Sequence, residues 1–504
     1  MRFTERKGAT APLTPMSIAR AIARECAPDA QRVGRAVAAL AVAALLSFAL
    51  SPTPARADEI SDLREMIRQL EARIKALEAE RAPPKAQVIA PVPPVTPDVP
   101  VAAAAPAPVP ESSESPYVPA ATMKADEEAS PRVDNAVIDP TMKGFFRIPG
   151  TETIIKIGGY AKVDFVYDTK PIGTFDYFVT SAIPTSGPDT QRGSNFTVHA
   201  KQTRLNLDLR RDTDLGKARL YFEGDWFGDA SYGFSQGGYK FRLRHAFGQV
   251  SNFAAGYSFS AFMDNDALPD TLDFEGPGSA AYLTLAGARY TWKVGTNANL
   301  SVAAEAPSAE ITVPVGGGRS TFPDVTLRAR YEADRGHLQL SGVWRKLGWR
   351  SGEGPGDTTN GYGINLAGSL KTVGDDYVVA GGIWGKGIAR YISDITGLGL
   401  DAVVDPDGNL QALEAYGGYA GYTHYWSPKL RSTAVVNYLG MSSKSWQAGS
   451  SFSNSQYYSA NLIWNPAGSF NVGLELLYGR YRTYDGLSAN DTRIQASVQY
   501  DFVR

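Results

Sequence analysis

The long alternation of apolar and polar residues in the last two-thirds of the chain constrains its fold most strongly. From about residue 151 to residue 502, many segments of ten or more residues alternate in this way, with no helical segments between them. In the first segment Ile157, Val163 and Phe165 share one face, while Lys162 and Asp164 share the other. A strand with an apolar face and a charged face separates lipid from water. About sixteen such strands predict a closed antiparallel β-barrel in a bacterial outer membrane, apolar outside and wet inside.

The composition argues against a bundle of membrane helices. Only 20% of the 504 residues are charged, and outside the N-terminus no run reaches the roughly 18 apolar residues of a membrane helix. A soluble β-sandwich is the alternative, because alternation alone does not show what covers the apolar face. Long segments and an alternation of short and long connections favour the barrel. The expected strands are 153–168, 196–211, 216–227, 239–250, 253–264, 280–293, 298–313, 324–334, 337–350, 360–371, 376–392, 409–426, 429–443, 453–465, 470–484 and 491–503.

Residues 1–57 are predicted to be a signal peptide. Two arginines precede an apolar run from 36 to 50, and the small residues Ala55 and Ala57 suit cleavage after Ala57. The single cysteine, Cys26, lies in this segment, so the mature chain would have no disulfide or thiol chemistry. Without the segment the chain has about 42 basic and about 49 acidic residues, a net charge of roughly −7 that disfavours a nucleic-acid partner.

Residues 58–81 carry the pattern of a short coiled coil. Apolar residues alternate spacings of three and four, with Ile at each a position and Leu at each d position. These core residues are Ile60, Leu63, Ile67, Leu70, Ile74 and Leu77. The pattern ordinarily favours a parallel dimer, whereas the segment from Arg73 to Glu78 resembles a short trimerisation motif, which favours a homotrimer. The alternative is an amphipathic helix that packs on its own domain.

Residues 82–140 are rich in Pro and Ala and are predicted to be a disordered linker. Such a segment cannot bury a core, and its prolines favour extended polyproline II. The linker would hold the coiled coil in the periplasm, near the cell wall and away from a barrel formed by residues 141–504. An unselected tether is an equally simple interpretation.

Several arginines alternate with outward apolar residues in the first half of the barrel, so they are expected to point into the lumen. Guanidinium groups stay charged and bind carboxylate or phosphate in a bidentate way, so a lumenal patch of them would favour anions. The predicted substrate pathway consists of Arg204, Arg242, Arg244, Arg289, Arg328 and Arg330. The alternative is that they only neutralise acidic residues of the wall, namely Asp208, Glu223, Asp225 and Glu332.

The connection 265–279 is the most acidic of the barrel and lies between the fifth and sixth expected strands. We expect it to fold into the lumen as a constriction loop, where acid opposite arginine would create a transverse field that orients polar solutes. The acidic residues are Asp264, Asp266, Asp270, Asp273 and Glu275. A solvated surface loop and a calcium site are the alternatives.

Other chemistry is sparse in the sequence. The four histidines, at 199, 245, 337 and 424, have no metal-ligand spacing, and the run Gly316 to Gly318 opens no helix that could bind phosphate. No cofactor, metal or enzymatic activity is predicted. An outer-membrane lipase that uses Ser and His is the remote alternative.

Several motifs resemble those of DcaP-like outer-membrane porins. They are 150–160, 203–205, 223–225, 242–246, 262–264 and 268–277. The resemblance covers the coiled coil and the first half of the barrel best. It implies a trimer of sixteen-stranded barrels, each with a periplasmic coiled coil, that passes small and often anionic solutes. The last strand also resembles a C-terminal assembly signal, although Val503 and Arg504 follow the aromatic Phe502.

We therefore expect a porin in the bacterial outer membrane that allows passive diffusion of small hydrophilic solutes, in particular carboxylate-type anions. Its expected partners are two further copies of the chain, outer-membrane lipid, the solutes and the cell wall. The rival hypothesis is an envelope tether in which the coiled coil and linker act and the barrel serves as the anchor.

Overall fold

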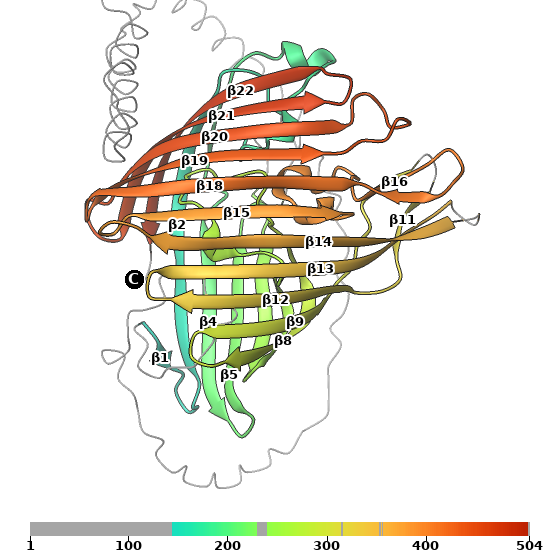
Figure 1. The fold of residues 1–504 in the computed structure, drawn as a ribbon. Coiled ribbons are helices and arrows are strands. Elements are labelled where there is room, and N and C mark those ends of the chain that lie inside the picture. Colours follow the sequence, from blue (N-terminus) through green and yellow to red (C-terminus); the bar gives the residue numbers. More distant parts are fainter. Residues whose placement is uncertain (1–143, 229–238, 314–315, 352–353, 355, 502–504) are drawn as a thin grey trace, which may run out of the picture. The chain divides into compact units, whose positions relative to one another are not determined.

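The computed structural model describes residues 144–228, 239–313, 316–351, 354 and 356–501. Within them sixteen long strands form one antiparallel sheet that closes on itself (Figure 1). β3 and β4 together form one of these strands. The strands are β2 (Ile154–Asp168), β3 (Asn195–His199) with β4 (Arg204–Thr213), β5 (Gly216–Asp225), β6 (Arg242–Val250), β7 (Phe253–Phe259), β8 (Thr284–Val294), β9 (Ala298–Glu305), β12 (Asp324–Ala333), β13 (Gly336–Arg350), β14 (Gly356–Lys371), β15 (Tyr377–Lys386), β18 (Glu414–Ser427), β19 (Leu430–Met441), β20 (Phe452–Trp464), β21 (Phe470–Thr483) and β22 (Ser488–Asp501).

The barrel closes between its first and last strands. β2 pairs with β22 along one edge, with Val163 opposite Val498, and with β4 along the other, with Ile157 opposite Leu207. The predicted antiparallel barrel of about sixteen strands is therefore confirmed. The predicted coiled coil, signal peptide and linker lie outside the described residues.

Short elements decorate this sheet. β1 (Phe146–Arg147) pairs with β2, β11 (Gly317–Ser320) pairs with β13, and a small separate sheet joins β10, β16 and β17. The bounds of the remaining elements are β10 (Ile311–Thr312), β16 (Ala402–Val404), β17 (Leu410–Ala412) and the 3₁₀ helices η3 (Thr180–Ala182), η4 (Pro188–Gln191), η5 (Asn265–Ala267), η6 (Ala389–Tyr391) and η7 (Ser393–Ile395). None of the helices in the described residues is long and apolar enough to cross a membrane.

Short and long connections alternate around the barrel, as the sequence predicts. The turns after β4, β6 and β12 contain two residues each, whereas β2, β7 and β15 are followed by the long connections 169–194, 260–283 and 387–413. In outer-membrane barrels the short turns face the periplasm and the long loops face outward. This assigns a periplasmic and an external end to every strand.

Three strands are shorter than the sequence pattern predicts. β7 ends at Phe259 rather than near residue 264, β9 ends at Glu305 rather than near 313, and β15 ends at Lys386 rather than near 392. After β7 and β15 the chain leaves the wall and packs inside the barrel. There no lipid imposes an alternation of apolar and polar residues. Phe262 and Ile388 are both fully buried there.

The outer face of the barrel is apolar and the inner face is polar. Leu327 and Leu340 are 60% and 52% exposed, whereas Arg328 between two such outward positions is 6% exposed. Lipid would cover the exposed leucines, so this inverted pattern is the one expected of a membrane barrel.

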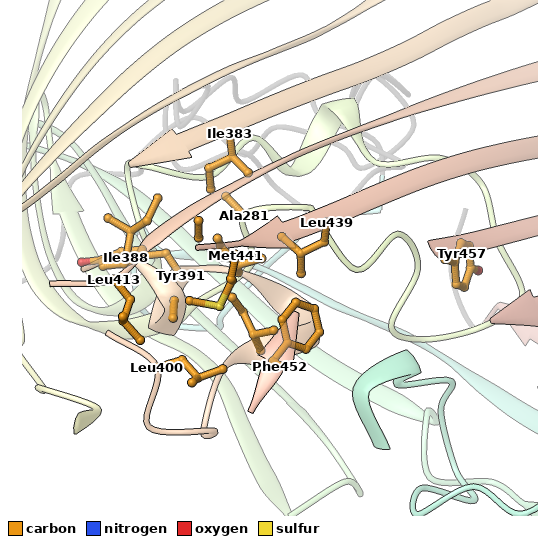
Figure 2. Packing of buried hydrophobic residues seen from close by; sticks show 14 of the residues in the cluster. Ala281, Ile383, Ile388, Tyr391, Leu400, Leu413, Leu439, Met441, Phe452 and Tyr457 are labelled. Carbon is orange, nitrogen blue, oxygen red and sulfur yellow. The ribbon is translucent and has the colours of Figure 1, made fainter. Parts of the chain in front are cut away.

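An apolar cluster fills part of the interior. It joins wall residues to the three long connections through Phe178, Phe262 and Tyr391, each at most 1% exposed. Figure 2 shows Ile388, Tyr391 and Leu413 of connection 387–413 near Ala281 and Met441. The connections are therefore packed into the barrel rather than spread over its rim.

Candidate functional site

The inner wall carries all six arginines of the predicted pathway, but the structure divides them into three groups. Arg204, Arg242 and Arg244 meet on β4 and β6, Arg289 and Arg328 lie on β8 and β12, and Arg330 faces connection 260–283. The largest accessibility belongs to Arg242, whose side chain is 32% exposed, compared with 12% for Arg204. The three groups therefore have different neighbours.

The first group surrounds two carboxylates of β5, and we call these five residues the β4–β6 cluster. Arg242 Nη2 lies 2.6 Å and Arg244 Nη1 3.3 Å from Asp225 Oδ2. Arg244 Nε and Arg204 Nη1 lie 2.8 Å and 3.4 Å from Glu223 Oε1. Three guanidinium groups thus face two carboxylates, which leaves one positive charge in excess.

A β-bulge in β6 brings additional inward side chains to the cluster. The register between β5 and β6 shifts at Glu223 and Gly224, so that Glu223 lies opposite His245 and Gly224 lies opposite Leu243. Arg244 is the extra residue, and it points inward together with Arg242 and His245. Strict alternation would place His245 on the lipid side. The bulge turns its side chain inward instead. Bulges commonly re-aim side chains beside functional sites.

The second group lies deeper in the wall. Arg289 and Arg328 are 8% and 6% exposed, and Arg328 Nη2 donates a hydrogen bond to Ser301 Oγ at 2.7 Å. The nearby carboxylate of Glu305 accepts hydrogen bonds from Ser260 Oγ and from the Ala261 backbone. This group supports the wall and the start of connection 260–283.

Arg330 anchors the beginning of the acidic connection to β12. Its Nη1 lies 2.9 Å from Asp264 Oδ1, its Nη2 3.0 Å from Asp266 Oδ2, and its Nε 2.6 Å from Glu332 Oε1. Burial acts to raise the pKa of Asp264, but the hydrogen bond with His337 and the charge of Arg330 hold it below its usual range. Asp264 is therefore held as a carboxylate against the wall.

A Ser, a His and an Asp meet at the same anchor. His337 Nε2 lies 2.7 Å from Asp264 Oδ2, and Ser369 Oγ lies 2.8 Å from His337 Nδ1. In serine hydrolases Nε2 faces the serine and Nδ1 faces the aspartate, so the order here is reversed. Asp264 is also shared with Arg330. The geometry supports a polar anchor between β13, β14 and the connection better than an activated nucleophile.

Connection 260–283 crosses the barrel interior. It is anchored at β12 by Arg330, and at β21 the backbone N–H groups of Leu272 and Asp273 donate to Glu475 Oε2 at 2.7 Å and 2.8 Å. Lys162 Nζ, from β2, donates to the Leu272 carbonyl at 2.6 Å. In the order of the sheet β12 and β21 are seven strands apart, on opposite walls.

The acidic residues of this connection meet the wall in more than one way. Asp270 Oδ2 lies 2.5 Å from Arg431 Nε of β19, a direct pair five strands away from β12. The β4–β6 cluster instead meets the ring of Phe274, which lies 4.9 Å from the Arg242 guanidinium carbon and 5.5 Å from that of Arg244. Such contacts are cation–π interactions. Acidic residues of the connection are thus paired directly with arginines at two anchors, whereas the connection meets the cluster through an aromatic ring.

Three carboxylates join the inward connections to one another. Asp273 accepts from the Phe178 backbone N–H at 2.9 Å, Glu275 accepts from Ser393 Oγ at 2.7 Å, and Asp394 accepts from the Ser181 backbone N–H at 2.9 Å. We call Asp273, Glu275 and Asp394 the carboxylate junction. Glu275 is half-buried. Burial, with the nearby charges of Asp273 and Asp394, raises the pKa of Glu275 to about 8.

Sequence reasoning missed the inward arginines of the second half of the barrel. They are fully or largely buried and each is paired with an acid: Arg345 with Asp324 and Asp401, Arg431 with Asp270, and Arg493 with Asp168. All occupy inward positions of alternating strands, so the same strand parity would have found them. In the first half, Arg210 and Arg219 share Asp208 in a similar way.

The described residues contain no group of three or more His, Cys, Asp and Glu placed to hold a metal ion. The acidic side chains of connection 260–283 are engaged instead by arginines, a histidine, a serine hydroxyl and backbone N–H groups.

A closed barrel of sixteen antiparallel strands, with a lipid-facing apolar surface and a loop folded inside, defines a porin-type channel of the outer membrane. The sequence model of the DcaP outer membrane protein family matches residues 140–502. The chain therefore belongs to the DcaP outer membrane protein family, as its motifs suggest.

Solved structures resemble the chain over the barrel. The crystal structure of the outer membrane channel DcaP of Acinetobacter baumannii has a TM-score of 0.63 and 22% identity, and covers 71% of this chain and 99% of that one. OmpT of Vibrio cholerae has a TM-score of 0.45 and 9% identity, and covers 70% of this chain and 99% of that one. An anion-selective porin from Comamonas acidovorans has a TM-score of 0.44 and 13% identity, and covers 70% and 100%. No curated protein sequence matches the chain significantly.

Proposed function

We propose that this outer-membrane channel passes small hydrophilic solutes by passive diffusion and prefers anions, with carboxylates as the chemical class. The β4–β6 cluster carries this proposal, because three guanidinium groups face only two carboxylates there. Arg242 is the member most accessible from the lumen. A guanidinium remains charged at every physiological pH and binds carboxylates through two parallel hydrogen bonds. An anion that passes the cluster therefore meets an excess of positive charge.

Connection 260–283 would act as the constriction of this channel, because it spans the interior between opposite walls. Asp264, Asp266 and Asp270 are paired directly with arginines, so they add little to a field across the opening. Glu275 would oppose Arg242 across the opening only when it is ionised. Since burial raises the pKa of Glu275 to about 8, its side chain is largely uncharged at neutral pH and leaves the positive excess less opposed.

Assembly as a homotrimer with a periplasmic coiled coil remains part of the proposal. It is supported by the heptad pattern of residues 58–81 and by the trimerisation motif from Arg73 to Glu78. The linker 82–140 would place the coiled coil near the cell wall. Together these segments would let the same chain also tether the envelope.

Ion selectivity in planar bilayers tests the channel. We expect the purified full chain in a salt gradient to give a reversal potential whose sign indicates preference for anions. We also expect conductance steps in groups of three. The double variant Arg204→Gln plus Arg242→Gln should conduct but lose most of this preference. Arg211→Gln is the matched control, since Arg211 lies outside the lumen at the periplasmic end of β4. A cation preference that the double variant leaves unchanged would reject the arginine mechanism, whereas absence of conductance would favour the envelope tether.

A further inference from the structure

We propose that the outer face of β20–β22, at its external rim, binds the phosphate groups of the anionic glycolipid in the outer leaflet. The site consists of Lys170, Arg480 and Arg482, which we call the rim site. Lipid A, a phosphorylated glycolipid, is the occupant that we propose. The inference concerns the lipid-facing surface and is independent of what passes through the lumen.

The two arginines project from one strand in the same direction. Arg480 and Arg482 are two positions apart on β21, so both lie on the outward face, roughly 7 Å from each other. Both side chains are exposed. In the register of the sheet Arg480 lies opposite Gln456 and Asn490, so amide groups flank the guanidinium on both neighbouring strands. Arginines and amides together are donors suited to phosphate oxygens.

Lys170 brings a third positive charge to the row of Arg480. Its ammonium donates a hydrogen bond to Asn490 Oδ1 at 2.5 Å, and Asn490 lies directly opposite Arg480. The Lys170 backbone N–H also donates to Asp491 Oδ1 at 2.8 Å, which fixes this end of connection 169–194 on the barrel. The lysine is therefore positioned beside the arginines rather than free to leave them.

The order of side chains along β21 follows the depth of a lipid leaflet. Towards the membrane from the arginines, Tyr478 and Tyr458 lie opposite each other with ring centroids 6.3 Å apart, and are 37% and 42% exposed. Leu476 follows on the same face and is 50% exposed. Basic, aromatic and apolar residues in this sequence match headgroup, interface and acyl chains.

Within the described part of the chain, the positive charge of the rim site is not neutralised by acidic side chains on the same face of the barrel. Among the described residues of β20–β22, the outward face carries no carboxylate, and neither Arg480 nor Arg482 has a hydrogen-bond or ion-pair partner within that part of the chain. Asp485, in the connection between β21 and β22, accepts a hydrogen bond from Thr483 Oγ1 at 2.6 Å. The inward arginines of the same barrel, such as Arg493 with Asp168, have acidic partners. Unmatched arginines at a lipid surface complement an anionic headgroup.

Binding of lipid A to the full chain tests this inference. We would titrate the purified protein in detergent with bis-phosphorylated lipid A and count bound lipid by native mass spectrometry. The variant Arg480→Gln plus Arg482→Gln should bind about thirtyfold more weakly, which corresponds to about 1 kcal/mol for each basic residue at an anionic surface. Arg211→Gln, an outward arginine at the periplasmic end, should bind like the unmodified chain.

Two further probes identify what the rim site recognises. Dephosphorylated lipid A should bind the unmodified chain as weakly as bis-phosphorylated lipid A binds the double variant. Inorganic phosphate should not compete with lipid A at equal concentration. Equal binding by dephosphorylated lipid A, or full competition by inorganic phosphate, would overturn the inference.

The fold and assembly of the variant show whether a loss of binding reflects the rim site itself. A double variant that still conducts in planar bilayers is folded, so its loss of lipid A would be a loss of the site. If the double variant instead binds lipid A normally, the inference fails. It also fails if the variant loses only its oligomeric state in lipid-free detergent, because the surface would then contact a second copy of the chain.

Discussion

The β4–β6 wall and the β12–β13 wall use arginine for different purposes. On β12, Arg330 is 4% exposed and faces Asp264, Asp266 and Glu332, so acid outnumbers base. On β6, Arg242 is 32% exposed and shares two carboxylates with two further arginines. One wall holds the connection in place, and the other presents net positive charge to the lumen.

The comparison shows that the type of residue alone does not define a pathway. An arginine contributes to the potential of the lumen only where its charge is not matched by neighbouring carboxylates and where water reaches it. An arginine that is buried and fully paired acts mainly on structure. The number of acids around each guanidinium, together with its exposure, therefore separates the two roles.

The largest effect should come from breaking the anchor. Arg330→Gln removes the arginine that pairs with the buried Asp264 and the half-buried Asp266, so we expect the local stability of connection 260–283 to fall by about 3–5 kcal/mol. Hydrogen exchange of the amides between residues 262 and 275 measures this loss. Arg335→Gln is the matched control, since Arg335 is exposed at the next turn and bonds only backbone carbonyls. Unchanged exchange in Arg330→Gln would show that the apolar cluster alone holds the connection.

The second effect should appear at the other wall. Arg242→Gln removes a partly exposed charge, which is worth about 1 kcal/mol to an ion a few ångströms away in water. We expect the anion-to-cation permeability ratio to fall several-fold, while hydrogen exchange of connection 260–283 stays unchanged. Reversal potentials measure the permeability ratio, and hydrogen-exchange rates on the same preparation measure the stability of the connection. A variant that loosens the connection without altering selectivity would assign Arg242 to anchoring and erase the difference between the walls.

The barrel could be predicted from the sequence because lipid imposes a strict period on every strand. An outward residue faces hydrocarbon and an inward one faces polar groups, so alternation, strand number and turn lengths are all visible in the chain. The structure places the six arginines of the predicted pathway on the inner face, and the same parity would also have found Arg431. What it could not show is the partner of each arginine, which depends on contacts between strands far apart in sequence.

The sequence predicts that connection 265–279 folds inward, but it does not show how the inward connections pack against one another. Once the chain leaves the wall after Phe259 or Lys386, no lipid imposes a period, and apolar residues pack against other connections. The meeting of Asp273, Glu275 and Asp394 joins segments more than one hundred residues apart. The bulge at Arg244 is equally local and invisible to alternation, because one extra residue changes which side chains face inward.

A smaller effect is expected where the connection touches the β4–β6 cluster. Phe274→Leu keeps an apolar side chain but removes the ring that lies over Arg242 and Arg244 and 4.7 Å from the ring of Phe227. Cation–π contacts of partly exposed groups contribute about 0.5–1 kcal/mol. We expect more frequent brief fluctuations of the single-channel current, with selectivity retained. Fluctuations equal to those of the unmodified channel would mean that Phe274 does not hold the connection near the cluster.

A gradual dependence on pH is expected at the carboxylate junction. The pKa of Glu275 is about 8 in the folded junction and 4.5 without it, so the junction binds a proton that the opened connection releases. Below pH 4.5 both states are protonated and Glu275 does not distinguish them. Between pH 4.5 and 8 the opened state is increasingly favoured, and above pH 8 the difference stays constant.

Hydrogen exchange at residues 272–276, corrected for its intrinsic pH dependence, should therefore show a progressively less stable junction as the pH rises from 5 to 8. Glu275→Gln removes the titrating group and should flatten this profile. Anion preference should also decline towards pH 9 in the unmodified channel, because the ionised Glu275 then opposes Arg242, and it should not decline in Glu275→Gln. A profile identical in both proteins would place the pH sensitivity on Asp273 or Asp394, whose pKa values burial also raises. The β4–β6 wall would then keep its positive excess at every pH, and the contrast with β12–β13 would rest on the arginines alone.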